Sequence, residues 1–353
     1  MAFKTAAGYG NLPNGNFSPV IYSKKVQSAF RKTSIVEDIT NSDYFGEIAN
    51  FGDTVRIIKE PEITVQEYAR GTQVTPQDLT DDDFTLVVDK ANYFAFKIDD
   101  IEEAHSHVNF ESMASDRAGY RLKDQFDQEV LGYLSGFKQT ALNTVASTAN
   151  DVKSGTDPVA AGSDGLLSSM ELTHGDFASG GTPANSIAMS ASNASAVATP
   201  LAILNRMSRL LDQQNVDRDG RWVVVDPVFA EELNDENSKL LNNDFAGGQN
   251  AGDILRNGRV ISGLIRGFRV YMSNNLPSIG TGSSTIATSG SGSNFGVIVA
   301  GHDSAVATAS QVEKVETYRD NDSFADIVRG MHLYGRKILR PEALVRAKYN
   351  LYS

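Results

Sequence analysis

The sequence predicts a mixed α/β (α+β) fold, in which one long helix and two groups of strands share the chain. Three observations predict it. A helical apolar pattern runs from Asp99 to Phe137, and strand-like alternation comes before it and again at the end of the chain. Between them, residues 199–233 follow the order helix, turn, strand, helix, which is typical of a mixed α/β domain.

The long helix is expected to organise the rest of the chain. Asp100 and Glu103 have the spacing of a capping box, which predicts that the helix begins there. Apolar residues then recur every four positions, so they form a stripe that winds slowly around the axis and can contact several elements. The stripe consists of Phe110, Ala114, Ala118, Leu122, Phe126, Val130 and Leu134. The charged residues between Asp116 and Glu129 predict a solvated opposite face.

The first 45 residues are predicted to form an extended arm. They contain several glycines and prolines and little periodic apolar pattern, apart from the short run Val26–Phe30. Up to Val36 there are five basic residues and no acidic one, whereas the whole chain has a net charge of −12. A basic arm on an acidic body predicts a contact with another copy of the chain.

A long hairpin is predicted between the arm and the helix. Val55 and Ile57 begin a strand pattern that continues to Val65, residues 69–83 form a polar tip, and residues 84–98 return. A two-stranded hairpin is marginal in water and needs a surface to lie on. We therefore expect the arm and the hairpin to form contacts between subunits. The predicted contact residues are Lys24, Lys25, Arg31, Lys32, Tyr68, Arg70, Asp81, Asp82 and Asp83.

The remainder of the chain supplies the α/β part. Residues 154–205 lack Lys and Arg and are rich in Ser, Ala, Gly and Thr, which predicts an exposed insertion of loops and short strands. Thr199 and Pro200 begin a helix, and Asp226 and Pro227 begin another after a buried strand at residues 222–225. Further strands are expected within residues 258–272, 297–301, 312–318, 328–338 and 345–351.

Composition excludes several classes of protein. The absence of cysteine removes thiol catalysis and disulfides, and the acidic net charge argues against a nucleic-acid binder. No run of eighteen apolar residues exists, and residues 1–15 lack the pattern of a signal peptide. We expect a soluble, intracellular chain without membrane contact.

No motif points to catalysis, a cofactor or a metal. His105 and His107 are two positions apart on the expected helix and cannot face one ion, so a solvated helix start is the favoured interpretation. The Gly280–Gly282 stretch lacks the lysine of a phosphate loop, and no Gly-x-Ser-x-Gly elbow is present. The sequence predicts no catalytic residue, no cofactor and no metal ligand, and therefore no enzyme.

Four stretches together resemble the major capsid protein of tailed bacteriophages, whose fold is shared with the herpesvirus capsid floor and bacterial encapsulins. They are residues 217–227 (DRDGRWVVVDP), residues 267–277, Ala300-Gly301-His302, and the ending formed by residues 330–335 and 340–344. Their order along the chain is similar to that of phage coat sequences.

The resemblance implies an organisation in five parts. Residues 1–50 would be the N-terminal arm, 51–98 the extended hairpin loop, and 99–140 the spine helix of a peripheral domain. Residues 141–324 would form the axial domain with its Ser/Gly-rich insertion, and residues 325–353 would return to the peripheral domain.

The resemblance also implies a function. The chain would assemble into pentamers and hexamers of an icosahedral head, located in the virion and built in the cytoplasm of a bacterial host, around double-stranded DNA that it does not bind sequence-specifically. A separate scaffolding protein, a portal and a decoration protein would be its partners. The hairpin tip has no lysine, and no long charged helical segment precedes the arm, so neither covalent crosslinking nor a built-in scaffold is expected. The alternatives are an encapsulin-like shell protein and a solitary α/β enzyme or binding module.

Overall fold

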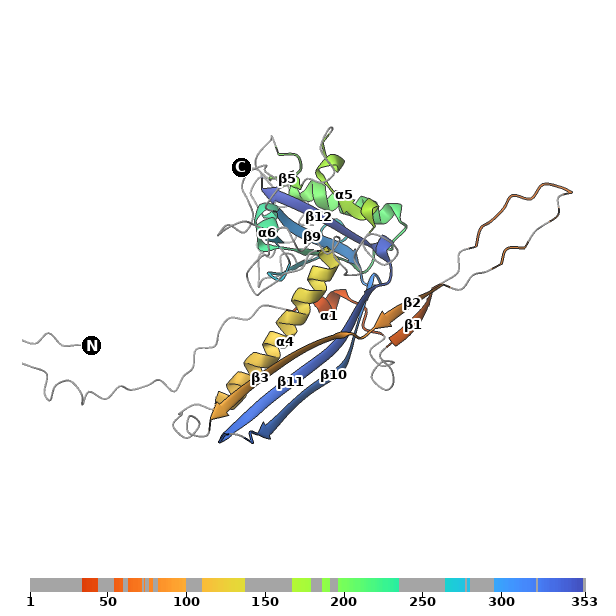
Figure 1. The fold of residues 1–353 in the computed structure, drawn as a ribbon. Coiled ribbons are helices and arrows are strands. Elements are labelled where there is room, and N and C mark those ends of the chain that lie inside the picture. The colour runs from red at the N-terminus through yellow and green to blue at the C-terminus, as the bar shows by residue number, and fades with distance from the viewer. Residues whose placement is uncertain are drawn as a thin grey trace, which may run out of the picture.

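Two sheets joined by a long helix form the body of the protein, and a two-stranded hairpin extends from it (Figure 1). This computed structural model describes residues 34–43, 54–59, 63–71, 73, 76–78, 82–99, 110–136, 167–178, 186–190, 196–234, 264–276, 278–279, 295–321 and 323–351. The mixed α/β class predicted from the sequence is confirmed. None of the helices in this described part is long and apolar enough to cross a membrane.

The long helix is α4, Phe110–Ser135. Its 26 residues correspond to about 39 Å at 1.5 Å per residue. The predicted start at Asp99 is wrong, because Asp99 is the last residue of strand β3 and pairs with Ala325. The expected cap at residues 100–103 and the residues up to 109 lie outside the described part. Figure 1 shows α4 running from the larger sheet down along the smaller one.

The smaller sheet has three antiparallel strands in the order β10-β11-β3. These are β3 (Lys90–Asp99), β10 (Val306–Arg319) and β11 (Ala325–Ile338). Its register places Phe94 opposite Gly330, where a Cβ atom would collide with the phenylalanine ring. The helix α4 lies along one face of this sheet (Figure 1).

The hairpin is shorter than the sequence predicts. Strand β1 (Thr54–Lys59) pairs with β2 (Asp82–Val87), with Thr54 opposite Val87. The return run does not continue along β1, because after residues 88–89 it pairs as β3 with β11. Residues 63–69 are in no strand, so the strand expected at Ile63 and Val65 is wrong.

The larger sheet has seven strands, covered on both faces. The order is β4-β12-β9-β6-β7, with β5 beside β12 and β8 beside β9. Their bounds are β4 Glu171–Leu172, β5 Ile187–Met189, β6 Arg221–Val225, β7 Arg269–Met272, β8 Ser278–Ile279, β9 Phe295–His302 and β12 Leu344–Leu351. Because cores lie on both faces, Arg346 and Asn350 of β12 are buried, although polar and apolar residues alternate along this strand.

Two helices cover one face of the larger sheet: α5 (Pro200–Gln213) and α6 (Pro227–Leu233). Both begin where the sequence predicts. The Thr199 hydroxyl accepts the Ala202 N–H at 3.3 Å, and the Asp226 carboxylate accepts the Phe229 N–H at 3.1 Å. The short helices are α1 (Val36–Ile39), η1 (Ser168–Met170), η2 (His174–Asp176) and η5 (Pro341–Ala343). The prediction of an exposed insertion is wrong for Met170, Leu172 and β5, which belong to the core.

Candidate assembly interface

The polar face of α4 binds the other parts of the body. The sequence predicted a solvated face, but Asp124 is 3% exposed and Asp127 is fully buried. The Asp127 carboxylate accepts hydrogen bonds from the Ser34 hydroxyl (2.8 Å) and the Ile35 N–H (3.1 Å). Burial raises the pKa of Asp127 to about 6, against an ordinary value of 3.8. This carboxylate therefore fixes the point where the N-terminal region meets the body.

Asp124 connects the helix to the larger sheet. Asn275, in the turn after β7, donates its Nδ2 hydrogen to Asp124 at 3.0 Å. Arg121, one turn earlier on α4, approaches the same carboxylate at 3.5 Å. A buried carboxylate with a hydrogen-bond donor on a distant loop fixes that loop against the helix.

The middle of α4 binds strand β11. The Tyr334 hydroxyl donates to the Glu129 carboxylate, and Arg336 donates to the Glu129 carbonyl. The Phe126 ring meets the Tyr334 ring edge-on, with centroids 4.9 Å apart. Burial and the neighbouring Glu129 raise the pKa of Tyr334 above its ordinary range, so this phenol stays protonated as a donor.

The C-terminal end of α4 binds strand β12. Arg346 donates to the Ser135 carbonyl at 2.6 Å and to the Glu171 carboxylate at 2.8 Å. Lys348 lies 3.2 Å from the same carboxylate. The helix thus holds the N-terminal region, both sheets and a connecting loop together, which is the organising role expected from its stripe.

The stripe itself divides into two halves. Phe126 is 8% exposed, and Val130 and Leu134 are fully buried. Ala114, Ala118 and Leu122 are half-buried, because only one sheet covers this end of the helix. The side chain of Phe110 lies outside the described part. The expectation of a continuous buried stripe therefore holds for the C-terminal half only.

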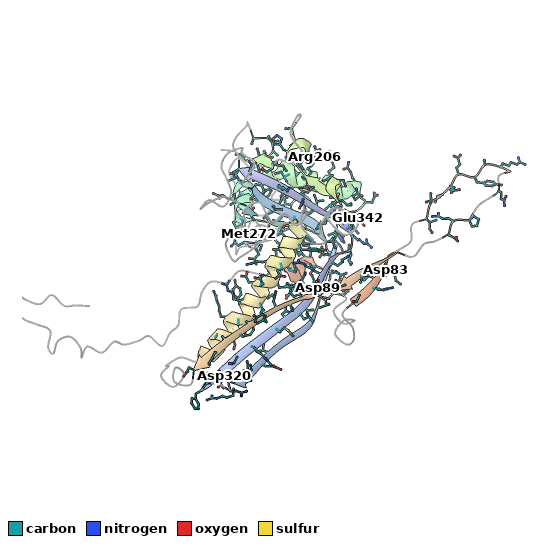
Figure 2. All side chains as sticks on the ribbon, in the orientation of Figure 1. Asp83, Asp89, Arg206, Met272, Asp320 and Glu342 are labelled. Carbon is teal, nitrogen blue, oxygen red and sulfur yellow. The ribbon has the colours of Figure 1, made fainter. Side chains whose placement is uncertain are left out.

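Apolar side chains of the hairpin are exposed. Ile58 is 83% exposed, Ile63 67%, Val65 92% and Tyr68 64%, and all of them lie on the segment that projects from the body (Figures 1 and 2). The smaller sheet, on the side away from α4, also exposes Tyr93 (79%). Exposed apolar groups in such numbers mark surfaces for protein contact.

The predicted contact residues fall into two groups. Tyr68 and Arg70 are exposed on the hairpin, and Asp83 lies 3.6 Å from Arg56 on the opposite strand. Asp82 is in β2, but its side chain lies outside the described part. The others, Lys24, Lys25, Arg31, Lys32 and Asp81, also lie outside it. Sequence reasoning missed Asp127 and Asn275, because no spacing pattern links residues that meet only through the fold.

The described residues contain no candidate metal site, because no three His, Asp or Glu side chains among them are placed to hold an ion together. The stretches around His105 and Gly280 lie outside them.

A comparison with protein families decides the identity. The family described as phage capsid protein matches residues 59–347. The chain belongs to the phage capsid protein family. It is the major capsid protein of a tailed-phage icosahedral head, a structural component of the virion and not an enzyme, and the resemblance inferred from the sequence is confirmed. A head built from this chain requires homo-oligomerisation.

Solved structures of phage capsids share the fold of this capsid protein. A structure from Mycobacterium phage Che8 is 25% identical, with a TM-score of 0.65, and the match covers 94% of this chain and 97% of the other. The capsid of cyanophage P-SCSP1u is 20% identical with a TM-score of 0.63, covering each chain fully. The capsid of Ralstonia phage GP4 is 13% identical with a TM-score of 0.65, covering 99% of each chain. No curated protein sequence matches significantly.

Proposed function

We propose that this capsid protein forms pentamers and hexamers of one closed shell around double-stranded DNA, and that its hairpin and arm link neighbouring subunits. The observation that carries the proposal is the projecting β1–β2 hairpin. Ile63 and Val65 are largely exposed on it, and among the described residues no part of the same subunit covers them. Burying such side chains against a neighbour removes apolar surface from water at about 25 cal/mol per Å².

Assembly into a ring places a neighbouring subunit against the exposed hairpin. In a ring each subunit presents two different surfaces, one to each neighbour, so the hairpin of one copy lies on a different part of the next copy. The exposed side of the smaller sheet, with Tyr93 (79% exposed), is available for such a contact, and Phe324 (79% exposed) lies beside it in the connection between β10 and β11.

Charge supports a second contact, between the arm and the hairpin. The arm carries Lys24 and Lys25 without any acidic residue up to Val36, and the hairpin carries three consecutive aspartates at residues 81–83, the last two at the start of β2. An exposed ion pair contributes only about 0–1 kcal/mol, but the same contact recurs at every subunit of a shell. The competing role for the arm is a salt-sensitive contact with packaged DNA.

The double variant Lys24→Glu, Lys25→Glu tests the arm contact. We expect fewer shells from an unaltered subunit fold, as measured by sedimentation and circular dichroism. The matched control Lys24→Arg, Lys25→Arg keeps both charges and is expected to assemble normally. Adding Asp81→Lys and Asp82→Lys to the double variant is expected to restore part of the assembly. Normal empty shells with a defect only in DNA filling would assign the arm to DNA.

The family resemblance supports further partners and a division of the chain. A separate scaffolding protein, a portal and a decoration protein complete the head, which is assembled in the cytoplasm of the bacterial host. The DNA is enclosed without sequence-specific binding, in keeping with the net charge of −12. The proposed division assigns residues 1–50 to the arm, 51–98 to the hairpin loop, 99–140 to the spine, 141–324 to the axial domain and 325–353 to the returning strands. In this division β3 and β10, from the hairpin loop and the axial domain, pair with the returning strand β11 in the smaller sheet.

A further inference from the structure

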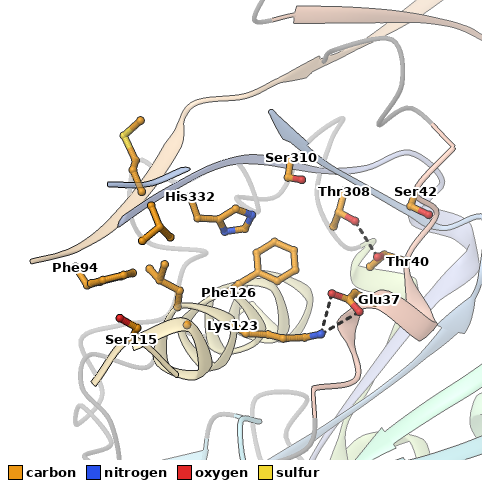
Figure 3. Close-up of a pocket in the computed structure, with 14 residues that line it drawn as sticks. Glu37, Thr40, Ser42, Phe94, Ser115, Lys123, Phe126, Thr308, Ser310 and His332 are labelled. Atoms are coloured by element: carbon orange, nitrogen blue, oxygen red, sulfur yellow. Dashed lines mark hydrogen bonds and ion pairs between the residues drawn. The ribbon is translucent and has the colours of Figure 1, made fainter. Parts of the chain in front are cut away.

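A groove of about 800 Å³ lies between α4 and the smaller sheet (Figure 3). Its apolar lining comes from both sides: Leu122 and Phe126 from the helix, and Phe94 and Val315 from the strands. A groove with this lining and volume is large enough for several side chains of a peptide segment. It exists because only the C-terminal half of the α4 stripe is packed closely.

The groove meets α1 at one end. Lys123 of α4 forms an ion pair with Glu37 of α1 at 3.0 Å. Thr40, just after α1, shares a hydrogen bond of 2.9 Å with Thr308 of β10. Both contacts are drawn in Figure 3, and all four residues line the groove.

The N-terminal region enters the body at that same end. Ser34 and Ile35 are held by Asp127, which follows the groove residue Phe126 in the helix. Residues 1–33 therefore leave from a point next to the groove, and any segment close to Ser34 can reach it without crossing the body.

The length and composition of that segment fit the groove. From Ser115 to Phe126 the groove follows twelve residues of α4, whose eleven steps of 1.5 Å span about 16 Å. About five residues of extended chain cover this distance, at about 3.3 Å each. The stretch Val26–Phe30 (VQSAF) has five residues, with apolar side chains at Val26, Ala29 and Phe30, and it ends four positions before Ser34. The basic pair Arg31-Lys32 would then pass the exposed carboxylates of Glu37 and Asp38.

We propose that Val26–Phe30 of the same chain occupies this groove, with Phe30 toward Phe126 and Val26 toward Ser115. This placement goes beyond the arm–hairpin contact and does not depend on it. It does orient the arm, because Lys24 and Lys25 then emerge at the Ser115 end, far from α1. The basic charges are thereby presented along the smaller sheet rather than at the root of the arm.

Disulfide trapping tests the placement directly, since the chain has no cysteine of its own. The full-length variant Val26→Cys, Ser115→Cys is oxidised as unassembled subunit, so that shell formation does not affect the result. The matched control is Val26→Cys, Asp116→Cys, because Asp116 is exposed and points about 100° away from Ser115 around the helix. We expect an intrachain disulfide at least tenfold faster in the first variant, seen by gel mobility without reductant and by peptide mass spectrometry.

Two outcomes would overturn the proposal: equal rates in the two variants, and disulfide-linked dimers, which would assign the groove to the arm of another copy.

Proteolysis gives a second, independent readout. Trypsin cleaves after Arg31 and Lys32, next to the proposed segment. The variant Val26→Asp, Phe30→Asp is expected to be cleaved there several-fold faster than the wild type. The control Val20→Asp, Ile21→Asp changes apolar residues outside the segment and is expected to leave the rate unchanged. Equal cleavage of all three proteins would show that the segment does not occupy the groove.

Discussion

The guanidinium of Arg346 donates a hydrogen bond of 2.6 Å to the carbonyl of Ser135, the last residue of α4. A cation at this position also interacts favourably with the negative end of the helix dipole. The next residue, Gly136, has a φ of +75°, and a Cβ atom there would collide with the guanidinium. This contact joins the long helix to a strand of the larger sheet.

Replacing Arg346 is therefore expected to be costly. The variant Arg346→Met removes the fully buried guanidinium. The Ser135 carbonyl then loses this hydrogen-bond donor, whereas the Glu171 carboxylate keeps its ion pair with Lys348. Removing one member of a buried ion pair typically costs about 3–5 kcal/mol. We expect a loss of that size in the free energy of unfolding of the subunit, measured with urea.

The control is Arg218→Met. Arg218 is 78% exposed and pairs with Asp212 at 3.0 Å, so its loss is expected to cost at most about 1 kcal/mol. Equal losses in the two variants would show that Arg346 does not join the helix to the sheet.

The two halves of the α4 stripe are expected to respond differently to truncation. Leu134 is fully buried, and Leu134→Ala is expected to cost about 2–5 kcal/mol of unfolding free energy. Leu122 lines the groove, where only the short segment Val26–Phe30 is proposed to cover it, so Leu122→Ala is expected to cost less than Leu134→Ala. Thermal and urea unfolding of both variants measure this difference. A larger loss for Leu122 than for Leu134 would contradict this division of the stripe.

Asp127 is expected to make stability depend on pH. Its folded pKa of about 6 is above its ordinary value of 3.8, so its contribution to stability is fully present below about pH 4 and is lost as pH rises through 6. The difference corresponds to roughly 3 kcal/mol. We therefore expect the unfolding free energy of the wild type, relative to Asp127→Asn, to fall between pH 4 and pH 7. If the unfolding free energies of the two proteins changed with pH in parallel, the raised pKa of Asp127 would be contradicted.

Much of the fold could be predicted from local patterns. The Thr199-Pro200 and Asp226-Pro227 pairs located both helix starts, because capping chemistry is local. The alternation at residues 345–351 located β12. The partner of β3 could not be predicted, since pairing with β11 joins residues more than two hundred positions apart, and alternation alone does not reveal a partner.

Less of the assembly interface than of the fold could be predicted from the sequence. The charges of Asp124 and Asp127 predicted solvent exposure, and only the fold brings Asn275 and Ser34 to them as donors. The exposed hairpin was predictable from its length and polar tip. Which neighbouring surface receives it depends on a second copy, and no pattern within one chain specifies that geometry.

Shells are expected to contain no covalent links between subunits. The chain has no cysteine, and the hairpin tip at residues 69–83 has no lysine from which an isopeptide bond could form. Purified shells, boiled in denaturant, should migrate as a single band near 38 kDa. A ladder of heavier bands would reveal crosslinking chemistry elsewhere in the chain.

Electron microscopy of purified particles shows directly how the subunits assemble. We expect closed icosahedral shells whose capsomers are pentamers and hexamers of this chain, with each hairpin lying on a neighbouring subunit. Reconstructed density with the hairpins free of any neighbour, or a preparation containing only 38 kDa monomers, would contradict it.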